Sequence, residues 1–276
     1  MVKELPINQI ICGDCVEVMK SWPEECIDLT VTSPPYDDLR DYRGYTFDFE
    51  SIARELYRVT KPGGVVVWVV GDATINGSET GTSFRQALYF KDVCGFNLHD
   101  TMIYKKKASR FPDTNRYYQV FEYMFVFSKG RPKTVNLIRD RRNLGFGNAI
   151  CEHARQKDGT LKKRKGKIIS KLGVRFNIWE YPTGGGISAR DEIAFQHPAI
   201  FPEQLAADHI ISWSNPGDIV LDPMCGSGTT CKMALKLGRR FMGIDIAEEY
   251  CEIARKRVEA EKERQKFQII PSSELT

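Results

Sequence analysis

Six consecutive apolar residues, Val65 to Val70, follow a Lys-Pro-Gly-Gly turn at positions 61–64. A continuous apolar run of this length is typical of a strand that is buried on both faces of a sheet. Directly before the turn, apolar residues recur at helical spacing between Glu50 and Val59, which predicts a helix that ends at the turn. This order favours an α/β fold in which helices cover both faces of a mostly parallel sheet.

The rest of the chain shows the same alternation. Further strands are expected at 10–12, 27–31, 97–104, 117–127, 219–221 and 240–244, and further helices at 16–22, 84–93, 201–213, 231–237 and 248–265. The alternation lapses between residues 131 and 179. We therefore expect one α/β domain whose halves, 1–130 and 181–276, are separated by an insertion at 131–180.

The insertion is strongly basic. Residues 129–175 hold 15 of the 40 Lys and Arg residues but only 3 of the 36 Asp and Glu residues, a local charge of +12 against −8 for the remainder. A basic block on an otherwise acidic chain favours a polyanion as partner, and nucleic acid is the leading hypothesis. A solvated loop is the alternative for the run from Lys162 to Lys167.

Other features of the composition exclude several classes of protein. The chain has no run of eighteen apolar residues and no apolar core of a signal peptide near its start, so we expect a cytoplasmic protein without a membrane partner. Its eight cysteines are too scattered for a secreted disulfide scaffold. Cys12 and Cys15 form a single C-x-x-C pair, and without a second pair no metal site is predicted.

The loop Asp222-Pro-Met-Cys-Gly-Ser-Gly-Thr-Thr230 lies between a predicted strand and a predicted helix. Gly226 and Gly228 allow a ligand to approach the backbone closely, and the helix that follows offers unpaired N–H groups. Asp245 ends the next strand, 17 residues after Gly228, where a carboxylate can accept hydrogen bonds from ribose hydroxyls. Asp222 can accept from an ammonium group. The third glycine of the dinucleotide fingerprint is missing, which favours a smaller, charged adenosine ligand.

A second segment, Thr32-Ser33-Pro34-Pro35-Tyr36, follows the predicted strand at 27–31. The two prolines fix φ and end the strand, so Ser33 and Tyr36 are held on a stiff turn. Backbone carbonyls that no ladder pairs then face outward as acceptors beside a stackable ring. This arrangement suits a planar base with an exocyclic amine, whereas a Pro-Pro turn with a packing tyrosine is the alternative interpretation of these residues alone.

Together these segments resemble the S-adenosylmethionine-dependent DNA amino-methyltransferases, specifically their permuted β class. Ser33–Tyr36 is similar to the catalytic motif of that family, and Asp222–Thr230 to its cofactor motif, with Met224 in place of the usual Phe. His197–Pro202 is similar to the segment that precedes the cofactor loop, Gly243–Asp245 to the ribose-binding strand end, and Gly13-Asp14 to the element near the adenine. The catalytic segment precedes the cofactor loop, since Tyr36 lies 186 residues before Asp222, and this is the order of the permuted class.

The resemblance implies a Rossmann-like methyltransferase fold in permuted order, S-adenosyl-L-methionine as cofactor, and the basic insertion as target-recognition region. The catalytic residues implied are Ser33, Pro34, Pro35 and Tyr36. The cofactor-binding residues implied are Asp14, Thr32, His197, Pro198, Phe201, Asp222, Pro223, Met224, Gly226, Ser227, Gly228, Thr229 and Asp245. Contacts with DNA are expected from Lys105, Lys107, Arg110, Arg141, Arg142, Arg155, Lys163 and Arg164, with surface solvation as the alternative for those at 105–110.

These residues suggest a mechanism for methylation of a base amine. The target base leaves the duplex and stacks on Tyr36, while Ser33 Oγ and the Pro34 carbonyl accept the two amine hydrogens and direct the nitrogen lone pair at the methyl group. In the family, Ser-Pro-Pro-Tyr accompanies cytosine-N4 methylation more often than adenine-N6 methylation, so N4-cytosine is expected and N6-adenine is the alternative. No Pro-Cys pair occurs, which argues against cytosine-C5 chemistry.

The expected function is therefore sequence-specific methylation of double-stranded DNA in restriction–modification or epigenetic marking. A cognate restriction endonuclease is a further expected partner, and a monomer or a homodimer is expected. Two rival functions are less favoured. The permuted order argues against an RNA methyltransferase, and the intact catalytic motif argues against a DNA-binding protein that only senses the cofactor.

Overall fold

The computed structural model describes residues 4–35, 47–107, 114–149, 153–163, 167–184, 188–200 and 202–269. The chain forms two compact units, one from residues 1–136 together with 178–276, and a smaller one from residues 137–177. The smaller unit lies in the chain segment that was predicted as the basic insertion. Its role in target recognition stays a prediction.

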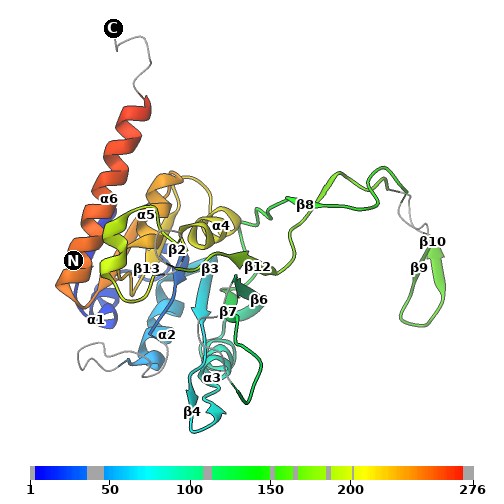
Figure 1. Cartoon of the computed structure of the whole chain (residues 1–276), viewed down its shortest axis with the longest axis horizontal. Coiled ribbons are helices and arrows are strands. Elements are labelled where there is room, and N and C mark those ends of the chain that lie inside the picture. The colour runs from blue at the N-terminus through cyan, green and yellow to red at the C-terminus, as the bar shows by residue number, and fades with distance from the viewer. Residues whose placement is uncertain are drawn as a thin grey trace. The chain divides into compact units, whose positions relative to one another are not determined.

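The larger unit is built on an eight-stranded sheet with the order β1-β14-β13-β2-β3-β7-β6-β12 (Figure 1). The strands are β1 (Gln9–Cys12), β2 (Ile27–Thr32), β3 (Thr60–Val70), β6 (Asn97–Lys106), β7 (Phe121–Ser128), β12 (Ile178–Tyr181), β13 (Ile219–Asp222) and β14 (Arg240–Asp245). Neighbouring strands pair in parallel, except that β7 runs antiparallel to both β3 and β6. A mostly parallel sheet confirms the predicted fold class.

Helices cover both faces of this sheet. One group comprises α1 (Cys15–Lys20), α2 (Phe49–Val59), α3 (Thr82–Leu88) and its π-helical continuation η1 (Tyr89–Val93). The other comprises the 3-10 helix η2 (Glu192–Gln196), α4 (Glu203–Trp213), α5 (Thr229–Lys236) and α6 (Glu248–Ile269). Within the first group α2 contacts α1, η1 and β3, and within the second α5 contacts α4, α6, β13 and β14.

The apolar run of β3 shows how the sheet is buried between these two groups. Val66, Trp68 and Val70 pack in one hydrophobic core with Leu56 of α2 and Phe90 of η1. The alternate residues, Val65, Val67 and Val69, are also buried but point to the opposite face. Burial on both faces confirms the prediction drawn from the uninterrupted run.

Several element ends differ from the prediction. The helix ends at Val59 as expected, but β3 begins at once at Thr60, because Thr60 pairs with Ile27 ahead of a register shift. The next pair is Leu29 with Val65, so the extra residues, 61–64, lie in β3. The strand expected from Tyr117 begins only at Phe121. β12 was not predicted, since four residues beside a basic insertion give almost no periodic signal.

The remaining strands form small antiparallel pairs. In the larger unit β4 (Thr74–Ile75) pairs with β5 (Ser78–Glu79). In the smaller unit β8 (Arg141–Arg142) pairs with β11 (Leu172–Gly173), and β9 (His153–Arg155) pairs with β10 (Leu161–Lys163). No helix in the described part of the chain is long and apolar enough to cross a membrane.

Candidate functional site

The strand order places the two predicted motifs side by side. β2 and β13 are neighbours in the sheet. After β13 the chain passes through α5 to β14, which lies on the side of β13 away from β2; after β2 it passes through α2 to β3, which lies on the side of β2 away from β13. The chain therefore leaves β2 and β13 in opposite directions, and in open α/β sheets a ligand crevice forms at the carboxyl ends of such a pair. The catalytic segment begins at the carboxyl end of β2, and the glycine loop begins at that of β13.

A buried hydrogen bond joins the two segments. Thr32 Oγ1 donates to Asp222 Oδ1 at 2.8 Å, and the Met224 amide donates to the same oxygen at 3.3 Å. Asp222 is 1% exposed, and this burial raises the pKa of its carboxyl to about 6 although the hydrogen bonds from Thr32 and Thr230 lower it. A nearby cation would stabilise the ionised form, so the position suits the ammonium group of a charged ligand.

Asp245 organises the glycine loop from the neighbouring strand. Its Oδ2 accepts from the Gly226 amide at 2.8 Å, and its Oδ1 accepts from the Ala247 amide at 3.0 Å. Burial raises the pKa of this carboxyl, and the backbone amides oppose the rise. A carboxylate has about four acceptor positions, so Asp245 keeps capacity for ribose hydroxyls.

Both glycines of the loop are required by the packing around them. Gly226 has φ +47°, and a Cβ there would lie 2.8 Å from Nε2 of His197. Gly228 has φ +75°, and a Cβ there would lie 2.7 Å from Cβ of Ala254 in α6. The His197 ring also meets the ring of Tyr250 edge-on at 4.3 Å between centroids. The structure thus brings the predicted His197-Pro198 segment against the cofactor loop.

The sequence interpretation missed Arg257 of α6, which holds the loop at 222–230 by hydrogen bonds. Arg257 of α6 is buried, and its Nη1 donates to the Ser227 carbonyl at 2.7 Å, to Ser227 Oγ at 3.0 Å and to Thr229 Oγ1 at 3.1 Å. Ser227 and Thr229 were both predicted to bind the cofactor. In the structure their hydroxyls accept hydrogen bonds from Arg257. Helical spacing puts Arg257 on the same face as the apolar Ala254, three positions earlier, but does not show that an arginine there is buried.

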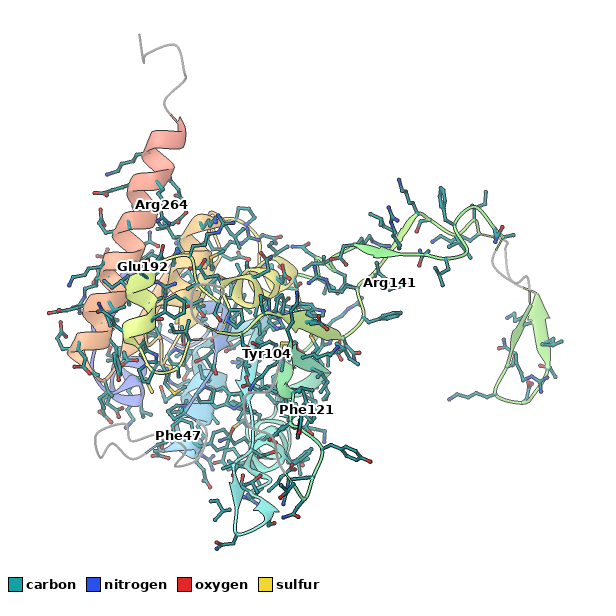
Figure 2. The ribbon with its side chains drawn as sticks, in the orientation of Figure 1. Phe47, Tyr104, Phe121, Arg141, Glu192 and Arg264 are labelled. Atoms are coloured by element: carbon teal, nitrogen blue, oxygen red, sulfur yellow. The ribbon has the colours of Figure 1, made fainter. Side chains whose placement is uncertain are left out.

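Arg257 belongs to a buried network of charges. Its Nη2 donates to Glu203 Oε1 at 2.9 Å and its Nε to Asp191 Oδ2 at 3.2 Å. Lys232 of α5 donates to the same two carboxylates. Arg264, labelled on α6 in Figure 2, reaches Asp191 from the surface at 3.3 Å. The network ties α4, α5 and α6 together beneath the cofactor loop.

The predicted catalytic segment begins at Thr32, which the hydrogen bond to Asp222 holds in place. Pro34 is buried, while Ser33 and Pro35 are half-buried. Tyr36 lies outside the described residues, as does Phe201 of the predicted cofactor set. Because Ser33 directly follows Thr32, the bond to Asp222 fixes where the turn begins.

Asp14 stands at the adjoining end of β1. The Gly13 amide donates to the Asp245 carbonyl at 2.9 Å, which places Asp14 beside the end of β14, the strand end that was predicted to bind the ribose. Asp14 Oδ1 caps α1 by accepting from the amides of Val16 at 2.8 Å and Glu17 at 3.0 Å. Its predicted role near the adenine is therefore combined with a structural one.

The predicted DNA contacts fall on both units. Lys105 is the penultimate residue of β6 and Lys107 directly follows that strand. Because β6 is parallel to β3, both lie at the carboxyl ends of the parallel strands, where the predicted catalytic segment also begins, and Lys105 pairs there with Glu180 at 2.7 Å. In the smaller unit the Arg141 guanidinium lies over the Phe176 ring at 4.4 Å and donates to the Val174 carbonyl at 3.0 Å. Arg142 and Arg155 are exposed. Arg110, Arg164 and the side chain of Lys163 lie outside the described residues.

Sequence comparison agrees with this geometry. A model of the DNA methylase family, which comprises N6- and N4-methyltransferases, matches residues 27–256. The orphan methyltransferase M.BamHII of Bacillus amyloliquefaciens is 63% identical over 249 residues, covering 89% of this chain and 90% of that protein. The DNA adenine methyltransferase YhdJ of Escherichia coli K12 is 28% identical over 267 residues, covering 91% of this chain and 82% of that protein.

Solved structures show the same fold. The cytosine-N4-specific PvuII DNA methyltransferase superposes with a TM-score of 0.66 at 21% identity, covering 90% of this chain and 85% of that one. A DNA modification methylase described as putative, from Thermus thermophilus and solved with S-adenosyl-L-methionine, gives a TM-score of 0.62 at 25% identity, covering 92% and 93%. S-adenosyl-L-methionine is therefore the cofactor, and the buried carboxylates and the α5 N-terminus fit its charge and its ribose. The chain belongs to the DNA methylase family and is a DNA methyltransferase of the N6/N4 type.

Proposed function

We propose that this methyltransferase transfers a methyl group to the N4 amine of a flipped-out cytosine at a specific sequence in duplex DNA, in restriction–modification or epigenetic marking. The observation that carries the proposal is the Thr32–Asp222 hydrogen bond of 2.8 Å. This bond supports the proposal because Thr32 directly precedes Ser33 and Pro34, our proposed acceptors for an amine, and Asp222 begins the loop that we expect to hold the methyl donor. When bound, the cofactor supplies an electrophilic sulfonium methyl group.

The residues of the chain then orient the reacting amine. An exocyclic base amine is a weak nucleophile because its lone pair is delocalised into the ring. Ser33 Oγ and the Pro34 carbonyl accept its two hydrogens, which localises the lone pair and turns it towards the cofactor loop. Tyr36 replaces the stacking lost on flipping, a contribution of about 1–3 kcal/mol per base at aromatic platforms.

We assign Asp222 to the ammonium group of the cofactor and Asp245 to its ribose. Asp222 is buried with a raised pKa, so it gains most from a cation, whereas Asp245 is held by backbone amides and keeps acceptor positions. Gly226 and Gly228 let the backbone of the loop pack closely against His197 and Ala254. Ser227 and Thr229 contribute to the loop mainly through their contacts with Arg257.

Serine at position 33 favours cytosine, because the family uses Ser-Pro-Pro-Tyr more often for N4 chemistry. The alternative is adenine N6, which is supported by the likeness to an adenine methyltransferase. For the target sequence, the smaller unit is our candidate, with its exposed Arg142 and Arg155. A cognate endonuclease would read the same sequence, and the active form is a monomer or a homodimer.

The decisive experiment is nucleoside mass spectrometry of duplex DNA treated with the enzyme and isotope-labelled cofactor. We expect labelled N4-methylcytosine, its near-complete loss in Ser33→Ala, and full retention in Ser78→Ala, an exposed serine on β5. Labelled N6-methyladenine without methylcytosine would overturn the base assignment. Labelled structured RNA with inert duplex DNA would overturn the proposed substrate.

A further inference from the structure

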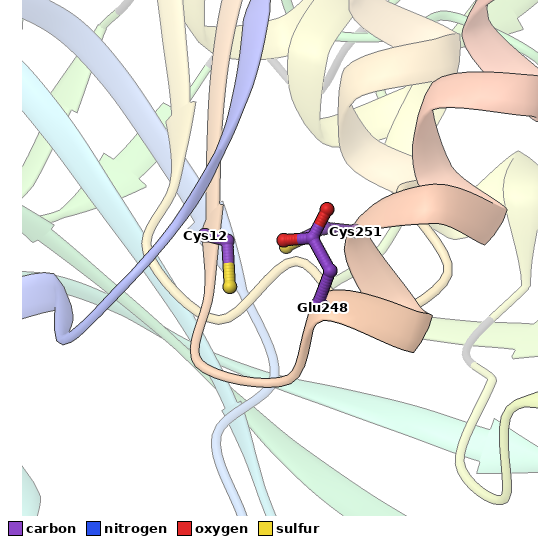
Figure 3. Close-up of side chains that lie close together, drawn as sticks. All are labelled: Cys12, Glu248 and Cys251. Carbon is purple, nitrogen blue, oxygen red and sulfur yellow. The ribbon is translucent and has the colours of Figure 1, made fainter.

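Three side chains with metal-binding atoms meet at the amino end of α6, beyond the residues assigned above. Cys12 ends β1 and is paired in register with Asp245 of β14, while Glu248 and Cys251 lie three residues apart on α6. The Cys12 and Cys251 sulfurs and a Glu248 carboxylate oxygen all lie within 4.8 Å of one another. Figure 3 shows the two α6 side chains directed towards Cys12.

We propose that Cys12, Glu248 and Cys251 form a binding site for one thiophilic divalent cation of the Zn²⁺ class. Two thiolates and one carboxylate are a donor set that Zn²⁺ accepts, and a water molecule completes the four-coordinate shell. In a tetrahedral site with Zn–S bonds of about 2.3 Å the two sulfurs lie about 3.8 Å apart. The present spacing of the donor atoms therefore needs only small side-chain movements.

The surroundings of the cluster match the charge of such an ion. Two thiolates and Glu248 carry three negative charges, and Arg255, which donates to Glu248 Oε1, supplies one positive charge. A divalent cation brings this set to neutrality. Without an ion the thiols stay protonated, because a hydrogen bond to Glu248 raises the pKa of Cys12 and burial raises that of Cys251 to about 12. Binding therefore displaces two thiol protons.

The fold already holds the two cysteines in position from both sides. Cys12 Sγ contacts the Ile246 carbonyl at 3.6 Å, and Cys251 Sγ contacts the Asp245 carbonyl at 3.5 Å. An ion here would join the end of β1 to the start of α6 across the loop that follows Asp245. This differs from the prediction of no metal, which considered Cys12 only with its neighbour Cys15. The partner instead comes from the far end of the chain.

The test is Zn²⁺ titration of the full-length protein, stripped with chelator and kept reduced, against a chromophoric competitor. We expect one ion per chain, loss of binding in Cys12→Ser and in Cys251→Ser, and affinity about tenfold weaker in Glu248→Gln. Cys94→Ser, at the end of η1 and outside the cluster, is the matched control and should bind normally.

A second readout guards against misfolded variants. Zn²⁺ should raise the thermal midpoint of the wild-type protein and of Cys94→Ser but not that of Cys12→Ser, because an ion that binds only the native state stabilises it. Cd²⁺ should also give sulfur-to-metal charge-transfer absorption in the same two proteins. Failure of the reduced wild-type protein to bind, or binding that survives both cysteine substitutions in folded protein, would overturn the site. A Cys12–Cys251 disulfide as the native state would overturn it as well.

Discussion

Two threonines on β2 allow the link between the catalytic segment and the cofactor loop to be tested with one substitution. Thr30 and Thr32 are both fully buried, and they lie two residues apart on the same strand. Thr32 Oγ1 donates to Asp222 at 2.8 Å, whereas Thr30 Oγ1 has no hydrogen-bond partner among the described residues. Replacing either threonine by valine exchanges a buried hydroxyl for a methyl group of similar size. The two variants therefore differ mainly in whether a hydrogen bond is lost.

The structure predicts effects of different magnitude and sign. Thr32→Val leaves the buried Asp222 carboxylate without one of its donors, which should cost about 1.5–3 kcal/mol of unfolding free energy. Thr30→Val removes a buried hydroxyl that gains nothing in the folded state, so the change should be neutral or stabilising by up to about 1 kcal/mol. The same substitution should therefore lower the unfolding free energy at position 32 and leave it unchanged or raise it at position 30.

The assay is urea unfolding of both variants well above the Asp222 pKa of about 6, where the carboxylate is ionised. Cofactor affinity by calorimetry and methyl transfer to DNA complete the comparison. Thr32→Val should lower both the cofactor affinity and the rate of methyl transfer. Without the hydrogen bond from Thr32 the pKa of Asp222 rises further, and the turn that begins at Ser33 is no longer held in position. Equal stabilities for the two variants, or full activity in Thr32→Val, would refute the reasoning.

Three further predictions concern charges and packing around the loop. Arg257→Met should cost about 3–5 kcal/mol and weaken cofactor binding, because it leaves the buried Glu203 and the largely buried Asp191 with Lys232 as their one shared buried cation among the described residues. Arg264→Met, at a side chain that is 53% exposed, should cost at most about 1 kcal/mol in the same denaturation assay. The pKa of Asp222 is about 6 in the folded state, above its ordinary value of 3.8, so between these pH values the folded state binds a proton that the unfolded state has lost. The unfolding free energy should therefore fall by about 3 kcal/mol as the pH rises from 3.8 to above 6. The difference in unfolding free energy between wild type and Asp222→Asn should follow that slope, and a difference independent of pH would contradict it. Gly228→Ala should lower the thermal midpoint, since it adds about 1–2 kcal/mol of backbone strain at φ +75° and a close contact with α6; an unchanged midpoint would show that the loop can relax.

Much of this architecture was available from local sequence patterns. The Val65–Val70 run predicted a strand buried on both faces, and Asp222 and Asp245 were each expected at the end of a strand, where the structure has them. These inferences succeeded because they depend on the alternation of elements within short windows. The parallel direction of most strands then follows from the rule that parallel strands need crossover connections, which are usually helical.

Features that depend on contacts between distant segments were not predictable in this way. Arg257 appeared to be one more charge on a strongly charged helix, and only the packing of α6 against the cofactor loop shows that it is buried. Cys12 and Cys251 are separated by nearly the whole chain and meet because β1 pairs with β14. Their proximity depends on sheet register, for which the sequence carries no local signal.

The position of Thr32 and Asp222 explains why the permuted motif order is compatible with the site. They are 190 residues apart in the chain but end adjacent parallel strands, from which the connections leave in opposite directions. The point at which the connections diverge exists whichever half of the domain comes first, so motif order affects connectivity and leaves the strand arrangement unchanged. A single buried carboxylate then contacts both the catalytic segment and the cofactor loop. A bound cation at Asp222 favours its ionised form, which strengthens the hydrogen bond from Thr32 and steadies the turn that begins at Ser33. If Asp222 binds the ammonium group as we propose, cofactor binding and positioning of the target amine are coupled through this one side chain.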